Sequence, residues 1–181
     1  MSLIYENKVP YAYRSAFVAR VKVISAALGI NPNWLMAIMY WESARTFSPS
    51  ITNSLGYTGL IQFGTAAAKD LGTTTAALRA MTAVQQLDYV YAYYKLWFRR
   101  LGIKKTDSYI STYLITLFPA AVNKPLSHII QKGSITAERF ANNNPAFDLN
   151  NDKKVTIAEV EKVMLKHLPS EWIKDFVKKK E

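Results

Sequence analysis

Apolar residues recur at helical spacing along almost the whole chain, and this periodicity is the strongest constraint on its fold. Residues 12–28 form an amphipathic segment closed by Gly29, and Asn31-Pro32 has the residue types that begin a helix. The predicted helices after the first are residues 32–43, 65–71, 75–101 with a break near Thr82, 109–122 with an interruption at Pro119, and three shorter ones beginning near residues 135, 156 and 170. No segment shows the sustained alternation of a β-strand. The sequence therefore predicts an all-α fold of roughly seven to nine helices.

Composition narrows the class of protein. Hydrophobic residues make up 50% and charged residues 20%, which is typical of a globular protein, and 181 residues allow one domain with a small appended module. The character of the chain changes around residues 133–147, so we expect a main domain at 1–132 and a helical extension at 133–181. No apolar run approaches the roughly 20 residues of a transmembrane helix. The first residues resemble no secretory leader, so we expect any export to use another route.

Charge and side-chain chemistry exclude some functions. With 0 Cys and 2 His, the chain has no disulfides, no thiol chemistry and no thiolate zinc site. Residues 1–137 carry 14 Lys and Arg against five acids, whereas residues 138–181 carry nine against eight. A basic main body fits an anionic polymer such as cell wall, nucleic acid or lipid surface, or it serves solubility alone. A nucleic-acid reader is disfavoured because no reader motif is present and the basic residues are scattered.

Glu42 is the most informative single residue. It shares one helical face with Leu35, Ile38 and Met39, and that face is otherwise apolar. A carboxyl group there loses hydration, and the negative end of the helix dipole adds to the effect, so both raise its pKa. A carboxyl group that stays protonated near neutral pH can act as a general acid. The alternative is a carboxylate at the helix end that faces water or pairs with Arg45.

A glycine-rich segment follows at residues 56–64, with the sequence Gly-Tyr-Thr-Gly-Leu-Ile-Gln-Phe-Gly. Three of the chain's seven glycines lie here, so the segment is predicted to be a loop with tight backbone turns. The loop presents the amide of Gln62 among apolar and aromatic neighbours. Tyr57 and Phe63 flank it and are candidates for stacking on a ligand.

The order of these fragments resembles a known group of enzymes. Glu42-Ser43, then Gly-Leu-Ile-Gln at residues 59–62, then Thr-Ala-Ala at 65–67 is similar to the soluble lytic transglycosylases and goose-type lysozymes. Those families have Glu-Ser, Gly-Leu-Met-Gln and a Thr-Ala helix start. The resemblance covers about residues 14–125 and implies a lysozyme-like catalytic domain that cleaves peptidoglycan.

The resemblance also implies roles for single residues. Glu42 would be the acid and base, Ser43 its polar neighbour, and Gln62 a contact to the sugar chain. The candidates for stacking on sugar rings are Tyr57, Phe63, Tyr113 and Phe118. Packing in a hydrophobic core is the alternative for each of these four rings.

One family motif is altered. The families have Ala-Tyr-Asn-Ala-Gly where this chain reads Leu-Phe-Pro-Ala-Ala at residues 117–121. Phe118 replaces the tyrosine and Pro119 the asparagine, so an aromatic wall survives but a hydroxyl and an amide are lost. This departure indicates a divergent branch. It also leaves the alternative that the chain is a catalytically inactive module, which binds cell wall or forms part of a phage particle.

The acidic residues bear on mechanism. No Asp or Glu lies between Glu42 and Gln62, and the next acids, Asp70 and Asp88, fall on predicted helices, with Asp88 expected to share a helix with Arg79. A single glutamate suits the transglycosylase route, which ends in a 1,6-anhydro ring on muramic acid. A hydrolytic lysozyme or chitinase-type enzyme, with a second carboxylate brought close by folding, is the alternative.

Residues 148–159 match the calcium-binding loop of an EF-hand. The candidate ligands are Asp148, Asn150, Asp152, the backbone carbonyl of Lys154, Thr156 and Glu159. Lys153 stands where the motif has glycine, which adds backbone strain and lowers the expected affinity. The alternative is a helix capping box formed by Thr156 and Glu159. With no partner loop visible in the sequence, we expect Ca²⁺ to staple the C-terminal helices.

The setting of the proposed activity follows from these features. A compact basic chain without a recognisable leader is typical of a phage or prophage product that acts in the virion or at lysis. We therefore expect peptidoglycan glycan strands as the partner and the periplasm or cell exterior as the place of action. The sequence leaves the oligomeric state open.

Overall fold

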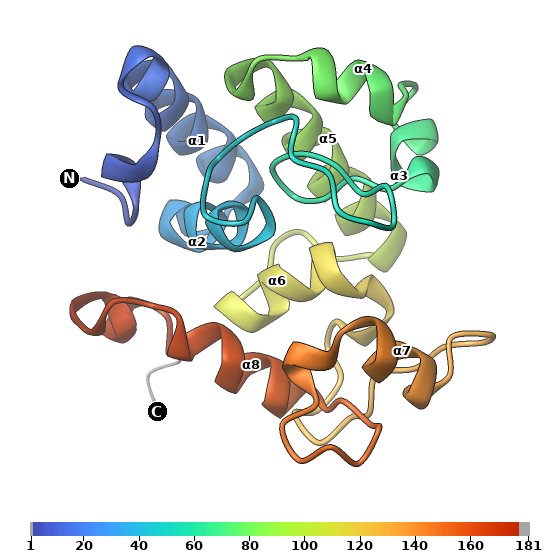
Figure 1. The fold of residues 1–181 in the computed structure, drawn as a ribbon. Coiled ribbons are helices and arrows are strands. Elements are labelled where there is room, and N and C mark those ends of the chain that lie inside the picture. Colours follow the sequence, from blue (N-terminus) through green and yellow to red (C-terminus); the bar gives the residue numbers. More distant parts are fainter. Residues whose placement is uncertain (1, 178–181) are drawn as a thin grey trace. The chain divides into compact units, whose positions relative to one another are not determined.

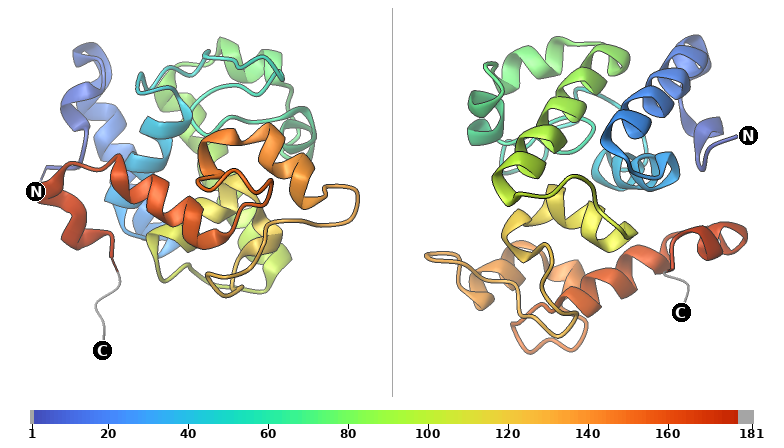
Figure 2. Two further views of the ribbon diagram at one scale, coloured as in Figure 1. Left: turned by 60° about the horizontal axis from the view of Figure 1, so that its bottom comes forward. Right: turned by 180° about the vertical axis from the view of Figure 1, so that it is seen from behind.

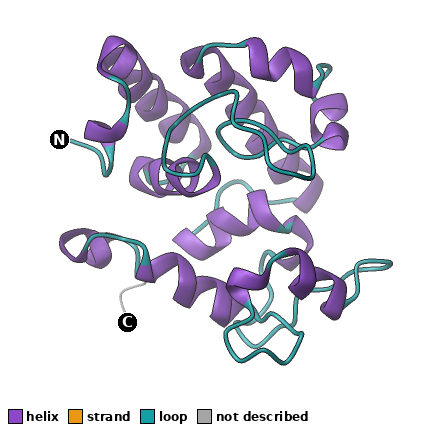
Figure 3. Cartoon of the chain, in the orientation of Figure 1, coloured by secondary structure: helices purple, strands orange, loops and turns teal. Residues whose placement is uncertain are grey.

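The structure is a computed structural model in which residues 2–177 are described. Helices account for 57% of the chain and the described part contains no sheet, which confirms the predicted all-α fold (Figure 3). By its internal contacts the chain divides into two compact units, Met1–Thr106 (unit 1) and Asp107–Glu181 (unit 2). The boundary expected from the sequence, between residues 132 and 133, falls inside unit 2.

Five α-helices form the described part of unit 1 (Figure 1). Their bounds are α1 Arg14–Leu28, α2 Pro32–Glu42, α3 Thr65–Asp70, α4 Thr75–Ala80 and α5 Ala83–Leu101, preceded by the short 3₁₀ turns Glu6–Lys8 and Tyr11–Tyr13. Helix α1 ends at Gly29, whose φ of 65° is the left-handed conformation that glycine adopts without strain. Asn31 caps α2 by accepting a hydrogen bond from the backbone N–H of Asn33 at 2.9 Å.

The long helical pattern at residues 75–101 is divided at Thr82, as the sequence predicted. Thr82 Oγ1 accepts from the N–H of Gln85 at 3.2 Å, and Gln85 Oε1 accepts from the N–H of Thr82 at 2.9 Å. This reciprocal capping box satisfies two N–H groups that a helix start leaves unpaired. The break places Arg79 on α4, so the expectation that it shares a helix with Asp88 was wrong.

The core of unit 1 lies where α1 packs against α5 and α2 (Figure 2). Helix α2 contributes Leu35, Ile38 and Met39, which are completely buried. Each such side chain stabilises the fold by about 1.5–3 kcal/mol through burial. The face that the sequence assigned to the core is therefore buried, and Glu42 is the last residue on it.

Unit 2 contains three α-helices in its described residues. Their bounds are α6 Tyr109–Leu117, α7 Ala137–Asn143 and α8 Ile157–Lys166, with 3₁₀ turns at Pro119–Ala121, Pro145–Phe147 and Ser170–Asp175. Helix α6 ends just before Pro119, because the proline ring excludes continuation of the helix. Helices α6 and α8 pack on each other.

No single helix among the described residues is long and apolar enough to cross a membrane. The segments Tyr11–Leu28 and Pro32–Glu42 reach the required length and composition only as a pair, and they are bent by 118°. The middle of α2, from Leu35 to Met39, is buried in unit 1.

Candidate functional site

Glu42 ends α2 and is half-buried. The chain reverses sharply after it, and Ala44, Arg45 and Phe47 adopt φ values of 50°, 67° and 53°. Non-glycine residues rarely occupy this left-handed region, and such strain is concentrated at functional sites. The turn therefore places Glu42 at the end of a buried helix, directly before a strained reversal.

Ser43 holds this turn together. Its buried hydroxyl donates to the carbonyl of Met39 at 2.6 Å and accepts from the N–H of Phe47 at 2.9 Å. The Ser43 carbonyl also accepts from Thr46 Oγ1 at 2.6 Å. The serine after Glu42 thus fixes the backbone that carries the carboxyl group.

The glycine-rich segment folds into a tight loop between α2 and α3. Thr58 and Phe63 exchange backbone hydrogen bonds, at 2.7 Å from the Phe63 N–H and 3.0 Å from the Thr58 N–H. Thr58 also pairs with Thr52, and their hydroxyl groups lie 3.0 Å apart. Gly59 has a φ of 81°, which explains why glycine stands at this position.

Gln62 lies at the turn of this loop, with a φ of 53°. Its Nε2 donates to the carbonyls of Gly59 at 3.2 Å and Ile51 at 3.4 Å. Among the described residues no group donates to its Oε1. The half-buried Gln62 can therefore offer a fixed hydrogen-bond acceptor to a ligand.

Tyr57 and Phe63, the aromatic residues of the loop, differ in exposure. The Tyr57 side chain is 44% exposed, and its ring covers Gly64, where an added Cβ would lie 2.7 Å from Cε1. Phe63 is buried and packs edge-on against Tyr93 at 6.0 Å between ring centroids. Tyr57 thus has a surface for stacking, whereas burial of Phe63 favours the packing alternative.

Gln86 is a site residue that the sequence reasoning missed. This completely buried amide on α5 accepts from the N–H of Leu60 at 2.7 Å and donates to the carbonyls of Pro49 and Leu78, both at 2.9 Å. The sequence pattern that could have identified Gln86 is its position on the buried, otherwise apolar face of α5, one residue before Leu87. A polar residue on such a stripe needs buried partners.

Tyr93 is the second residue that the sequence reasoning missed. Burial is the main cause that raises its pKa, and the charges of Glu42 and Tyr57 act in the same direction. A hydrogen bond with Trp97 and the charge of Arg100 oppose them. Glu42 of α2 and Tyr57 of the loop are thus both close enough to Tyr93 of α5 for their charges to affect its pKa.

The other acidic residues described in unit 1 are engaged with partners of their own. Asp70 pairs with Arg100 at 2.7 Å, and this hydrogen bond is the main cause that lowers the pKa of the Asp70 carboxyl group. Asp88 accepts from Arg20 Nε at 2.8 Å, and Glu6 accepts from the N–H of Leu3 at 2.7 Å.

The remaining two stacking candidates belong to unit 2. Tyr113 is buried and packs against Phe147 with ring centroids 6.2 Å apart. Phe118 is 9% exposed and packs against Phe140 at 5.5 Å. Both contacts favour the packing alternative for these rings.

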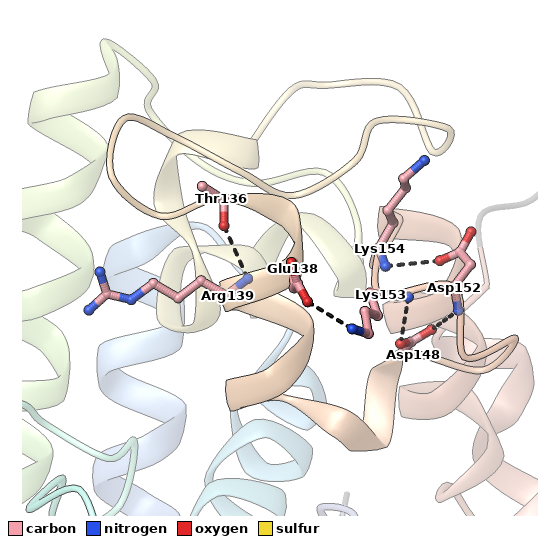
Figure 4. Close-up of polar contacts among 7 residues, drawn as sticks. All are labelled: Thr136, Glu138, Arg139, Asp148, Asp152, Lys153 and Lys154. Carbon is pink, nitrogen blue, oxygen red and sulfur yellow. Dashed lines mark hydrogen bonds and ion pairs between the residues drawn. The ribbon is translucent and has the colours of Figure 1, made fainter.

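The loop at residues 148–159 is closed by its own hydrogen bonds (Figure 4). Asp148 accepts from the N–H groups of Asp152 at 3.2 Å and Lys153 at 3.0 Å, and Asp152 accepts from the N–H of Lys154 at 2.9 Å. Lys153 adopts a φ of 62°, the conformation for which EF-hand loops have glycine. Its Nζ pairs with Glu138 at 2.9 Å, which lowers the pKa of the Glu138 carboxyl group.

Glu159 takes part in the capping box that was the alternative to calcium binding. Its Oε2 accepts from the N–H of Thr156 at 2.9 Å, and Thr156 Oγ1 accepts from the N–H of Glu159 at 3.3 Å. Its Oε1 accepts from the N–H of Leu149 at 3.3 Å. Within residues 2–177, no group of three His, Asp or Glu side chains is arranged to hold a metal ion. Calcium at this loop stays a prediction.

A second segment pairs with this loop, although the sequence showed no partner for it. The N–H of Ile130 donates to the carbonyl of Val155 at 2.8 Å, and the N–H of Ile157 donates to the carbonyl of His128 at 3.1 Å. The loop is therefore supported along its C-terminal half by backbone hydrogen bonds. Helix α7 precedes the loop in the chain, and Thr136 caps its start by accepting from the N–H of Arg139 at 3.2 Å (Figure 4).

Comparison of the chain with protein-family models, with curated proteins and with solved structures finds no match. The resemblance to lytic transglycosylases stays a prediction from the sequence, made on Glu42-Ser43 and on the segments 59–62 and 65–67. In the structure the first pair ends α2, and the other two form the loop and the start of α3.

Proposed function

We propose that this chain is a peptidoglycan lytic transglycosylase that cleaves the β-1,4 bond between MurNAc and GlcNAc. The protonated carboxyl group of Glu42 gives its proton to the glycosidic oxygen as the C1–O bond breaks. The resulting carboxylate then accepts the proton of the muramic acid 6-hydroxyl, whose oxygen attacks C1. The ring closes to 1,6-anhydroMurNAc, and Glu42 is protonated again.

The observation that carries the proposal is the neighbourhood of Glu42. The carboxyl group ends a helix with a buried face, and its charge acts on Tyr93 of α5, on which the charge of Tyr57 from the loop also acts. Tyr57 exposes part of its ring, and Gln62 of the same loop offers an acceptor oxygen. An acid, an aromatic surface and an amide are the groups that bind and cleave a sugar chain.

The state of the other acids favours transglycosylation over hydrolysis. Most glycosidases that use water or an enzyme nucleophile have a second carboxylate beside the first. In unit 1, Asp70 and Asp88 are held by arginines, and Glu6 binds the N-terminal backbone. The transglycosylase route needs only Glu42, because the substrate supplies the nucleophile.

For unit 2 we propose a structural Ca²⁺ ion. The side chains of Asp148, Asn150, Asp152 and Glu159, with Thr156 and the carbonyl of Lys154, supply the hard oxygen donors that calcium prefers. The ion would tie the end of α7 to the start of α8. The enzyme would act on the cell wall, from the periplasm, from outside the cell or from a phage particle.

The test of the proposed activity is release of soluble fragments from purified peptidoglycan. We expect Glu42→Gln to lower the rate by about 10²–10⁴-fold, the usual contribution of a general acid. Asp88→Asn is the matched control, because it neutralises an exposed acid of the same unit that lies on α5 and pairs with Arg20. Equal rates for wild type and Glu42→Gln would remove Glu42 as the acid, and no fragments from wild type would favour a wall-binding module.

A further inference from the structure

Gln86 joins three segments of unit 1 through one buried side chain. Its Oε1 accepts from Leu60 of the glycine-rich loop at 2.7 Å. Its Nε2 donates to the carbonyls of Pro49, in the segment between α2 and that loop, and of Leu78 of α4, both at 2.9 Å. The amide therefore uses both N–H groups and its oxygen on backbone atoms of other segments.

The loop lies directly against this amide. A Cβ built on Gly59 would come within 2.3 Å of Gln86 Oε1, so no side chain fits between the loop and α5. Gly59 and Leu60 are followed by Gln62, and Tyr57 precedes them by two residues. The two residues proposed to contact sugar thus stand on either side of the point at which the loop is held.

Helix α5 carries both Gln86, which holds the loop, and Tyr93, which interacts with Glu42. Gln86 and Tyr93 lie on its buried face, seven residues and about two turns apart. Tyr93 interacts electrostatically with Glu42 and Tyr57. A loop attached at Gln86 is therefore held at a fixed distance from the residues that surround the acid.

We infer that Gln86 is a positioning residue, which sets the binding of the glycan by holding the loop of Tyr57 and Gln62 against α5. This inference rests on the proposed function. Gln86 itself is completely buried, so it acts on the substrate through the loop. Its loss is expected to weaken glycan binding more than it slows the chemical step at Glu42.

The test compares Gln86→Leu with Val90→Ala. Leucine keeps a buried apolar body but removes all three hydrogen bonds, whereas Val90→Ala removes apolar volume one turn further along the same face of α5. Hydrogen exchange of residues 49–64 and steady-state kinetics on soluble, uncrosslinked glycan strands are measured for both. Temperatures are chosen at which both variants are more than nine-tenths folded by circular dichroism.

For Gln86→Leu we expect exchange at the Leu60 N–H to be at least about tenfold faster, because one buried hydrogen bond is lost. We expect KM to rise about tenfold, with kcat within about threefold of wild type. Val90→Ala should leave both the loop exchange and KM unchanged. A merely structural role predicts instead that Gln86→Leu, when more than nine-tenths folded, keeps both the KM and the kcat of wild type, and that result would overturn the inference.

Two further outcomes are separated by the same measurements. If wild type cleaves no glycan, the proposed function fails, whereas the exchange at Leu60 still decides whether Gln86 holds the loop. If Gln86→Leu does not fold, Gln86→Asn takes its place, because its shorter amide cannot span from Leu60 to Pro49. Failure of both variants to fold would show a role in the whole fold and would contradict a specific positioning role.

Discussion

The carboxyl group of Glu42 and the phenol of Tyr93 interact electrostatically, although they belong to α2 and α5, which are separated by the glycine-rich loop and two short helices. The negative charge of Glu42 disfavours the phenolate, in addition to the burial of the ring. The Tyr93 hydroxyl therefore stays neutral to a higher pH than an unperturbed tyrosine would.

The raised pKa of Tyr93 predicts a dependence of stability on pH. Because this pKa lies above that of an unfolded tyrosine, about 10, the contribution of neutral Tyr93 to the free energy of unfolding is fully present below pH 10. It is lost as the pH rises further, since the unfolded chain then ionises first. Urea unfolding of wild type and Tyr93→Phe from pH 8 to pH 11 measures it. The difference in free energy of unfolding between wild type and Tyr93→Phe should be constant up to about pH 10, and above that pH wild type should lose stability relative to the variant. A wild type that gains stability relative to the variant at pH 11 would contradict the raised pKa of Tyr93.

The turn after Glu42 predicts a strong effect of Ser43→Ala. This change leaves the buried N–H of Phe47 without a partner, so the free energy of unfolding should fall by about 1–3 kcal/mol. Ser25→Ala is the matched control, because Ser25 Oγ is equally buried and has no hydrogen-bond partner in the described structure. Urea unfolding should show Ser25→Ala to be neutral or stabilising. Equal losses for the two variants would show that the Ser43 hydrogen bonds do not hold the turn.

Two glycines test how closely the loop approaches α5. Gly59→Ala meets both a φ of 81° and Gln86 Oε1 at 2.3 Å, whereas Gly72→Ala meets only a φ of 70° in open space. Gly59→Ala should therefore lower the free energy of unfolding by at least about 1 kcal/mol more than Gly72→Ala. It should also weaken glycan binding. Equal destabilisation of the two variants would mean that the loop is free to move away from Gln86.

The calcium proposal is tested by thermal unfolding. With Ca²⁺ at about 100 times its dissociation constant, binding to the folded chain should add about 2.7 kcal/mol and raise Tm, and a chelator should reverse the gain. Asp148→Ala should abolish the response, because Asp148 takes the first ligand position of the loop. Glu171→Gln, outside the loop, serves as the control and should keep it. Identical curves with Ca²⁺ and with chelator would leave the capping box of Thr156 and Glu159 as the loop's only role.

The sequence predicted the helices well because their ends carry local signals. Gly29, Asn31 and Thr82 act through their own backbone preferences or through neighbours within three residues, so no tertiary information was needed. The break at Thr82 was visible for the same reason. By contrast, the division into two compact units depends on long-range contacts, and it lies at Thr106, whereas the sequence pattern led us to expect a change of domain after residue 132.

The site was only partly predictable. Glu42 and Gln62 could be chosen because each interrupts an apolar pattern within its own segment. Gln86 forms its hydrogen bonds with residues up to 37 positions away, and local spacing does not reveal such partners. Tyr93 stands in a run of aromatic residues on α5, in which helical periodicity could not distinguish a ring beside the acid from one in the core.

The most direct test of the central claim is the chemical identity of the sugar ends that wild type leaves on purified peptidoglycan. Transglycosylation by Glu42 alone predicts muropeptides that end in 1,6-anhydroMurNAc, each lighter by one water molecule than the product of hydrolysis. Mass spectrometry should find these ends with wild type and Asp88→Asn, and should lose them with Glu42→Gln. Reducing MurNAc ends in place of anhydro ends would contradict the account, because water would then be the nucleophile.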